Sequence, residues 1–126
     1  MIQQQTILRV SDNSGAKTAK CIKVLGGSKK KIGHVGDTII VSIQQLRNKS
    51  KRTSKVKKGE IYKALIIRTK KTTEHNNKTT FTFFNDNAIS LINKQNNPIA
   101  TRIFGPVSKK VKNNYLKFAS ISNGFA

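Results

Sequence analysis

The residues best suited to binding chemistry form a basic run over 47–58. This run contains seven Lys and Arg side chains and no acidic residue: Arg47, Lys49, Lys51, Arg52, Lys55, Lys57 and Lys58. Cations that meet phosphates release condensed counterions, so the run is suited to contact with a nucleic-acid backbone. A solvated loop is the usual alternative for such a run, and we expect parts of it to be disordered without a partner.

Three further basic clusters repeat this pattern elsewhere in the chain. They are Lys29, Lys30 and Lys31, then Lys70 and Lys71, then Lys109, Lys110 and Lys112. The chain has 25 Lys and Arg against five Asp and Glu, a formal net charge of +20. This charge destabilises a compact chain, and a polyanion relieves the repulsion. Dispersed clusters favour a surface wrapped by folded RNA, with anionic membranes and acidic proteins as the competing partners.

Residues that could support catalysis or bind a metal are few. Cys21, His34 and His75 lack metal-site spacing, and a buried thiol is the default for a cysteine in a strand. The acidic residues are scattered at turns, which predicts local hydrogen bonds or pairing with nearby lysines: Asp12, Asp37, Glu60, Glu74 and Asp86. No Gly-rich phosphate loop or nucleophile motif is present. We therefore expect no cofactor, no metal and no enzyme.

The apolar residues that must position these side chains occur in short runs separated by Gly, Asn, Asp or Lys, which predicts a small all-β domain. We expect strands at 6–10, 19–25, 38–43 and 61–68, and a hairpin that joins 79–84 to 88–92 across 85–87. The predicted fold is a single domain over 1–126. It comprises a small closed β-barrel with a basic loop over about 1–95, and an irregular, partly helical region over about 96–126.

Two further predictions concern a C-terminal helix and the role of three phenylalanine rings. A helix over 108–116 would begin at Ser108, which is a suitable N-cap residue. Phe81, Phe83 and Phe84 could stack on bases, but their alternation with Thr is typical of an ordinary strand. We expect these three rings to pack in the core.

Several ordered segments of the chain resemble one known family. They include Asp-Asn-Ser-Gly-Ala-Lys at 12–17, the run at 21–28, Val-Gly-Asp at 35–37, the runs at 56–59 and 68–71, and Thr-Arg-Ile-Phe-Gly-Pro-Val at 101–107. In this order, and over nearly the whole chain, they resemble the fourteenth protein of the large ribosomal subunit, the universal L-fourteen family. The last of these segments is very specific.

The resemblance implies a five-stranded β-barrel with a projecting ribbon and a small C-terminal helical region. It also implies binding to large-subunit rRNA and a bridge to small-subunit rRNA, formed by the C-terminal side over 101–112. Its implied neighbours are large-subunit proteins three and nineteen, and a ribosomal silencing factor is a further partner. The expected rRNA contacts are the four basic clusters together with Lys17, Arg68 and Arg102 of the matching segments.

Three departures from the family pattern bear on these expectations. The loop at 46–54 is longer and more basic than usual, which suggests an extra rRNA contact. His75 and the following residues replace the usual Asp-Gly turn, and the end at 119–126 lacks an acidic-proline close. This different end puts docking of the silencing factor in doubt.

Composition also bears on location. A single cysteine excludes an internal disulfide, no apolar stretch approaches the roughly 18 residues of a membrane span, and 1–6 resembles no signal or transit peptide. Lys outnumbers Arg four to one and Asn is abundant, a bias typical of an AT-rich genome. We expect a mitochondrial ribosome, with a bacterial cytoplasm as the alternative and a plastid third. The rival functions are a free basic RNA-binding regulator, a membrane-active protein and an RNA-processing enzyme.

Overall fold

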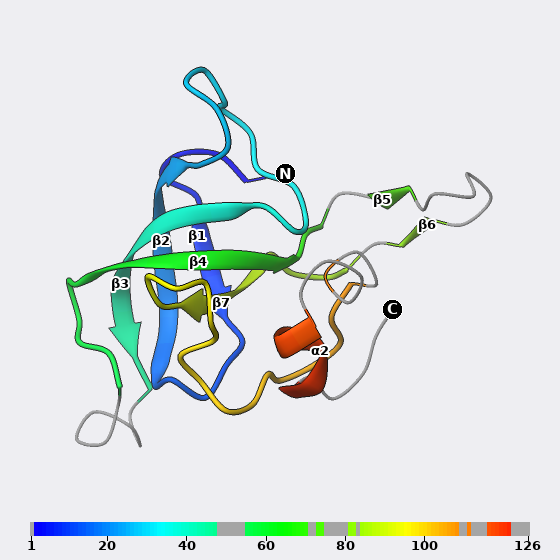
Figure 1. Cartoon of the computed structure of the whole chain (residues 1–126). Helices are drawn as coiled ribbons and strands as arrows, with labels where there is room; N and C mark the ends of the chain where they lie inside the picture. Colours follow the sequence, from blue (N-terminus) through cyan, green and yellow to red (C-terminus); the bar gives the residue numbers. More distant parts are fainter. Residues whose placement is uncertain are drawn as a thin grey trace.

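The structure is a computed structural model, and it describes residues 2–47, 55–70, 73–74, 81–82, 84–108, 111 and 116–121. Five strands form a closed barrel in the order β1-β2-β3-β4-β7 (Figure 1). They are β1 (Ile7–Val10), β2 (Ala16–Val24), β3 (Thr38–Leu46), β4 (Ile61–Arg68) and β7 (Ala88–Ile92). The predicted small five-stranded barrel is therefore confirmed.

The barrel closes through a short parallel contact between β1 and β7. Only Arg9 with Ala88 and Val10 with Ile89 pair there, whereas the other four neighbouring pairs are antiparallel. The first two residues of β1, Ile7 and Leu8, are therefore not paired with β7. This seam between β1 and β7 borders a groove that is described below.

The predicted hairpin between 79–84 and 88–92 is wrong. β7 pairs with β4 and β1, whereas β6 (Phe81–Thr82) pairs with β5 (Thr73–Glu74) in a separate two-stranded sheet. Every residue of β7 is buried, because the strand has a neighbour on each side and apolar packing on both faces. Residues 85–87 therefore lead from the projecting ribbon into the barrel (Figure 1).

Two other strands are longer than predicted. β2 begins at Ala16 rather than at residue 19, and β3 continues to Leu46 rather than ending at residue 43. Their pairing is interrupted by register shifts between Ala16 and Thr18, Thr18 and Ala19, and Cys21 and Lys23. Such irregularities break the alternation of polar and apolar residues from which a strand is recognised in a sequence. The bounds of β4 match the prediction.

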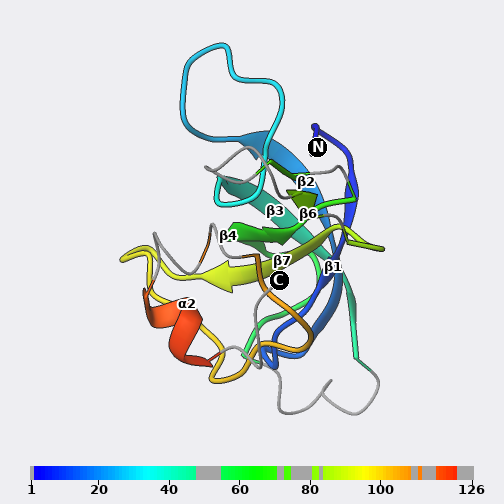
Figure 2. The same cartoon turned by 90° about the vertical axis from the view of Figure 1, so that its right-hand side faces the viewer.

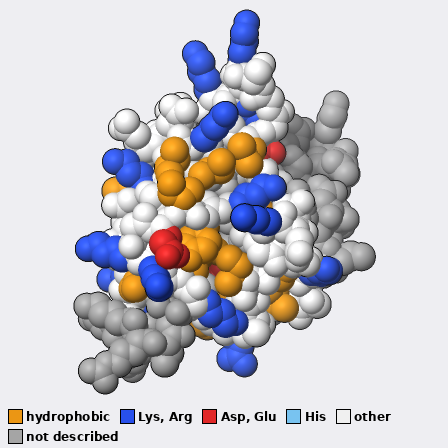
Figure 3. All heavy atoms as spheres, turned by 60° about the vertical axis from the view of Figure 1, so that its left-hand side comes forward, with side chains coloured by type: hydrophobic (Ala, Val, Ile, Leu, Met, Phe, Trp, Pro, Cys, Tyr) orange, Lys and Arg blue, Asp and Glu red, His pale blue; other side chains and the backbone are white. Residues whose placement is uncertain are grey.

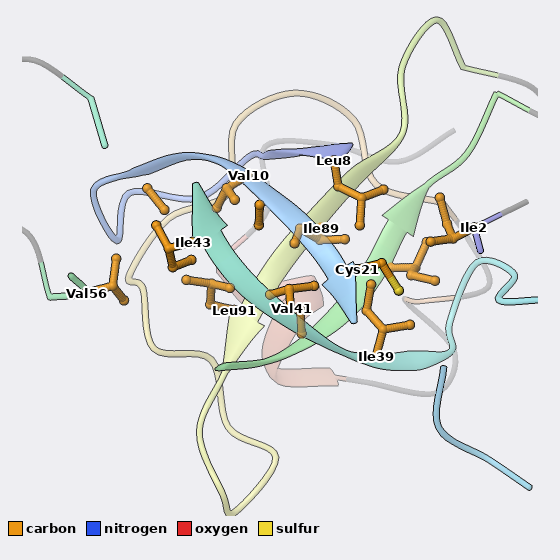
Figure 4. Packing of buried hydrophobic residues seen from close by; sticks show 14 of the residues in the cluster. Ile2, Leu8, Val10, Cys21, Ile39, Val41, Ile43, Val56, Ile89 and Leu91 are labelled. Atoms are coloured by element: carbon orange, nitrogen blue, oxygen red, sulfur yellow. The ribbon is translucent and has the colours of Figure 1, made fainter. Parts of the chain in front are cut away.

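The longest apolar run of the chain lies in β4 because this strand contributes to two hydrophobic clusters. Ala64 and Ile66 join the barrel interior with residues such as Leu8, Val41 and Leu91 (Figure 4). Leu65 and Ile67 point to the other face, where Ile103, Val107 and Val111 cover them. Successive strand residues face opposite sides, so an uninterrupted apolar run requires a cover on each side. The second cover comes from the C-terminal segment.

The described part of the C-terminal region contains the helix α2 (Leu116–Ile121), and Ile121 packs against the second cluster. α2 lies beside the β4–β7 side of the barrel in two perpendicular views (Figures 1 and 2). Most of the helix predicted over 108–116 lies outside the described residues. Phe84 is buried as predicted, while the side chains of Phe81 and Phe83 lie outside the described part. No helix among the described residues is long and apolar enough to cross a membrane.

Candidate nucleic-acid interface

Few of the basic side chains that the structure describes form ion pairs within the protein. The described residues form three ion pairs: Arg9 with Asp86 at 3.6 Å, Lys30 with Asp37 at 2.9 Å and Arg68 with Asp86 at 3.3 Å. Figure 3 shows Lys and Arg side chains spread between apolar patches over one face, with little acidic surface among them. The surface therefore offers many cations to an external anion.

One groove collects cations from four parts of the barrel, and we name it the seam groove. Arg9 of β1, Lys17 of β2, Arg47 at the end of β3 and Lys70 after β4 line it, with Asp86 as the single carboxylate. Its remaining lining residues are Ile7, Leu8, Thr18, Leu46 and Asn87, and its volume is about 800 Å³. Lys17, Arg47 and Lys70 are predicted contacts that the fold brings together from distant parts of the sequence.

Arg9 is a residue of this groove that sequence reasoning missed. It stands alone between Leu8 and Val10 and belongs to no basic cluster. Strand alternation is the signal that could have found it, because Leu8 and Val10 are buried while Ile7 and Arg9 are exposed. Its side chain is 65% exposed although it pairs with Asp86.

A second groove, of about 770 Å³, lies beside the loop that follows β2, and we name it the amino-terminal groove. Lys23, Lys29, Lys30 and Lys31 line it together with the glutamines at 3–5. The loop projects from one end of the barrel in Figures 1 and 2. Lys29 and Lys31 are exposed, whereas Lys30 is half-buried and paired with Asp37. Three predicted lysines thus share one hollow, and Lys23 is an addition to them.

Arg47 combines a place in the seam groove with internal contacts. Its Nη2 donates a hydrogen bond to the carbonyl of Val10 at 3.2 Å. Its guanidinium carbon lies 5.3 Å from the centre of the Phe104 ring, a cation–π distance. Arg47 therefore connects the end of β3 to the C-terminal segment while it borders the groove.

Arg68 is buried and engaged by internal partners. Its Nε lies 3.3 Å from Asp86, its Nη2 donates to the hydroxyl of Ser11, and its Nη1 reaches the carbonyls of Phe104 and Pro106 at 3.5 Å each. Burial lowers the pKa of Arg68, an effect that Asp86 opposes and Arg9 reinforces. The guanidinium holds the segment around Gly105 against β4 and faces the interior rather than an external phosphate.

The turn at 12–15 is a second anchor of the same C-terminal segment. The buried carboxylate of Asp12 accepts hydrogen bonds from Ser14 N at 3.2 Å, Ser14 Oγ at 2.5 Å, Leu91 N at 2.9 Å and Ser90 Oγ at 3.3 Å. The next residue, Asn13, accepts from the backbone N–H groups of Thr101 and Arg102 at 2.9 and 3.1 Å. Local hydrogen bonding was predicted for Asp12, and here it joins the turn to β7.

The other predicted contacts are exposed or lie outside the described residues. Lys55, Lys57, Lys58 and Arg102 are exposed, and Lys55 Nζ donates to the carbonyl of Ile99 at 3.3 Å. Seven predicted contacts fall outside the described part: Lys49, Lys51, Arg52, Lys71, Lys109, Lys110 and Lys112.

The described residues contain no group of three or more His, Cys, Asp or Glu that could hold a metal ion. Cys21 is a free thiol buried in the barrel, as predicted, and burial raises its pKa. His34 is exposed, and its backbone N–H donates to Asp37 Oδ2 at 2.8 Å. The chemistry that the described side chains favour is thus anion binding.

Comparison with known families agrees with this arrangement. A family model described as ribosomal protein L14p/L23e matches residues 1–126, the whole length of the sequence. The closed barrel, the basic surface and the anchored segment at 101–107 all lie within the matched region. The chain therefore belongs to the ribosomal protein L14p/L23e family, and its role is that of a structural component of the large ribosomal subunit.

Proposed function

We propose that the chain binds large-subunit rRNA through a basic surface made of the seam groove, the amino-terminal groove and the loop at 47–58. The observation that carries this proposal is the seam groove, where four cations from separate parts of the chain line one hollow together with a single carboxylate. That carboxylate, Asp86, is already paired with two arginines, so it adds little repulsion toward phosphate. The net charge of +20 supports a polyanionic partner for the rest of the surface.

The proposed contacts exclude one residue of the sequence-based set. Arg68 is left out because its guanidinium is buried against Asp86, Ser11 and the carbonyls beside Gly105. The contacts that remain from the predicted set are Lys17, Lys29, Lys30, Lys31, Arg47, Lys49, Lys51, Arg52, Lys55, Lys57, Lys58, Lys70, Lys71, Arg102, Lys109, Lys110 and Lys112. Arg9 and Lys23 join them through the two grooves.

These contacts act mainly on the RNA backbone. A lysine ammonium is a compact point charge that meets phosphate without the planar fork that reads a base edge. Binding through lysines is driven by counterion release, and its affinity falls steeply as salt rises. The protein then stabilises folded rRNA by neutralising phosphates that would otherwise repel one another.

We assign the bridge to small-subunit rRNA to the C-terminal side, over 101–112. Two anchors support this assignment, because Asn13 and Arg68 hold the segment in place while Phe104, Gly105 and Pro106 stay exposed. Large-subunit proteins three and nineteen are the proposed neighbours, and a ribosomal silencing factor is proposed to dock toward the same end.

The proposed location is a mitochondrial ribosome, and the alternative is a bacterial one. The abundance of Lys and Asn supports a gene in an AT-rich genome. Detection of the protein in ribosomes from purified mitochondria, and not in cytoplasmic ribosomes of the same cells, is the expected result. Its presence in the cytoplasmic fraction alone would contradict the proposal.

A charge-removal experiment tests the rRNA contact. Replacing Lys55, Lys57 and Lys58 by Ser should reduce the slope of log affinity against log salt by about 2–3, since each phosphate contact contributes about 0.7–0.9. The matched control replaces Lys20, Lys94 and Lys117, three cations outside the proposed set. Equal slopes for the two variants, with unchanged incorporation into subunits, would refute the loop contact.

A wash experiment separates the ribosomal role from the rival role of a free basic regulator. A structural component should stay with large subunits after a high-salt wash, because shape and neighbouring proteins hold it in addition to charge. A free regulator held by charge alone should be removed. Quantifying the protein in pelleted and released fractions decides between them.

A further inference from the structure

We propose that the seam groove holds an unpaired nucleotide of the rRNA, whose base lies on Ile7 and whose phosphates meet the surrounding cations. This inference rests on the proposed rRNA binding and adds the class of RNA structure that the site recognises. The groove carries two kinds of surface that a phosphate backbone alone would not require together. These are a rim of four cations and an apolar side chain presented to the outside.

The apolar part of the groove includes Ile7, one of four large apolar side chains that are exposed among the described residues. Ile7 lies on β1, and its side chain is 66% exposed. It pairs with Lys20 of β2 and also lines the groove beside the charged residues. Leu46, half-buried at the end of β3, adds a second apolar side chain. Phosphates gain nothing from these aliphatic groups, whereas the flat face of a base covers apolar surface and stabilises the contact by removing it from water.

The size of the groove also selects a nucleotide. A volume of about 800 Å³ lies in the range of small-ligand sites, so the hollow accommodates a splayed-out base with its ribose. Bases inside an RNA duplex are stacked, and only their edges and the backbone are accessible. Bases in loops and bulges are free to enter such a hollow.

The charges are placed to hold the nucleotide by its backbone. Lys17, Arg47 and Lys70 come from three different parts of the chain and line the same groove as Ile7 and Leu46, so cations and apolar side chains share one hollow. Arg9 contributes a fourth cation, whose side chain is 65% exposed, and its partner Asp86 is shared with Arg68. An acidic peptide would satisfy the cations but would leave the apolar part without a flat partner, which favours RNA.

The test uses the full chain and two RNA probes, and each variant is compared with the parent on each probe. One is a single-stranded hexamer that carries 2-aminopurine and 4-thiouridine, and the other is a short perfect duplex. The central variant is Ile7→Ser, and its matched control is Ile61→Ser, because Ile61 is also 66% exposed but lies outside the seam groove. Both side chains are exposed, so both variants should fold.

We expect Ile7→Ser to weaken binding of the single strand by about fivefold. This is the effect of removing slightly more than one buried methylene group from the contact. Duplex affinity should not change, and Ile61→Ser should match the parent with both probes. The 2-aminopurine signal should respond to binding in the parent and in Ile61→Ser but not in Ile7→Ser. Cross-links from 4-thiouridine should map to residues 7–18.

A second variant tests the cationic rim without touching the apolar part. Lys17→Gln should weaken single-strand binding about fivefold at 0.1 M salt and reduce the salt slope by about 0.7, the share of one phosphate contact. Lys94→Gln, an exposed lysine outside both grooves, is the control and should leave the slope unchanged.

The possible failures are distinguishable. If the parent binds neither RNA probe, the proposed rRNA binding itself fails. If the parent binds RNA but Ile7→Ser equals Ile61→Ser and the cross-links fall elsewhere, the seam-groove inference fails and the rRNA proposal stands. If a glutamate-rich peptide of equal charge displaces the hexamer and is itself weakened by Ile7→Ser, the groove is a peptide site and the inference is overturned.

Discussion

The guanidinium of Arg68 lies directly beneath Gly105, where it reaches the carbonyls of both neighbouring residues, Phe104 and Pro106. A Cβ atom at position 105 would overlap Nη1 of that guanidinium. The backbone of Gly105 also has a φ of +76°, which residues with a side chain rarely adopt. Position 105 must therefore be glycine because the Arg68 guanidinium occupies the space that a Cβ atom would need.

The first prediction follows from that overlap. Gly105→Ala should lower the free energy of unfolding by about 2–4 kcal/mol, since it combines backbone strain with displacement of the buried Arg68 guanidinium from its partners. Gly59→Ala is the control: its φ is +83° and nothing lies within 4 Å of its Cβ position, so strain alone should cost about 1 kcal/mol. Urea unfolding of both variants measures the difference, and equal losses would contradict the role of Arg68.

The second prediction concerns the anchor at Asn13. Asn13→Ala removes the acceptor of two backbone N–H groups, so the amides of Thr101 and Arg102 should exchange with solvent about tenfold faster. Asn93 supplies a matched control because its Oδ1 accepts from Gln95 N and Asn97 N, both at 2.9 Å. Asn93→Ala should leave exchange at 101 and 102 unchanged. Acceleration by both variants would show general destabilisation instead of a local anchor.

The third prediction addresses the buried carboxylate of Asp12. Asp12→Asn replaces one acceptor oxygen by a donor group that faces the N–H of Leu91 or the groups of Ser14, and should cost about 2–3 kcal/mol. Asp37→Asn is the comparison, because its ion pair with Lys30 is partly exposed and should cost below about 1 kcal/mol. Thermal unfolding gives both values, and a loss at Asp37 as large as that at Asp12 would refute the structural role.

The fourth prediction concerns alkaline pH. Burial raises the pKa of Cys21, so the folded state keeps the thiol protonated at a pH where the unfolded chain has begun to lose the proton. The contribution of Cys21 to stability is therefore complete below about pH 8.5, which is the pKa of the thiol in the unfolded chain. It declines as the pH rises from there through the pKa of the folded state. Comparing the parent with Cys21→Ala between pH 8 and 10 isolates this effect because other titrations cancel. Parallel stability curves would contradict it.

The barrel and its most apolar strand could be predicted from the sequence, whereas the pairing of β7 could not. Residues 61–68 contain the longest apolar run of the chain, at 64–67, and the predicted bounds match β4. The sequence at 88–92 is compatible with pairing to 79–84 and equally with pairing to β4 and β1, because the local pattern of a strand does not identify its partner. Only barrel closure settles which neighbours a fully buried strand takes.

The basic residues show the same limit for the candidate interface. Arg68 and Lys70 are neighbours in one basic segment, yet Arg68 is buried and Lys70 lines the seam groove. The difference arises from Ser11, Asp86 and the carbonyls around Gly105, which are distant in the sequence. Arg9 gives the converse case, since an isolated arginine joins three other cations only when the barrel has closed.

The sharing of β4 between two hydrophobic clusters has a consequence for assembly of the ribosome. Leu65 and Ile67 have their cover only when the segment with Ile103 and Val107 has docked, so folding of the barrel and ordering of that segment are coupled. Much of the conformational entropy of residues 101–107 is therefore lost before the protein meets RNA. This part of the protein arrives preorganised, so its encounter with the growing particle resembles rigid docking rather than folding upon binding.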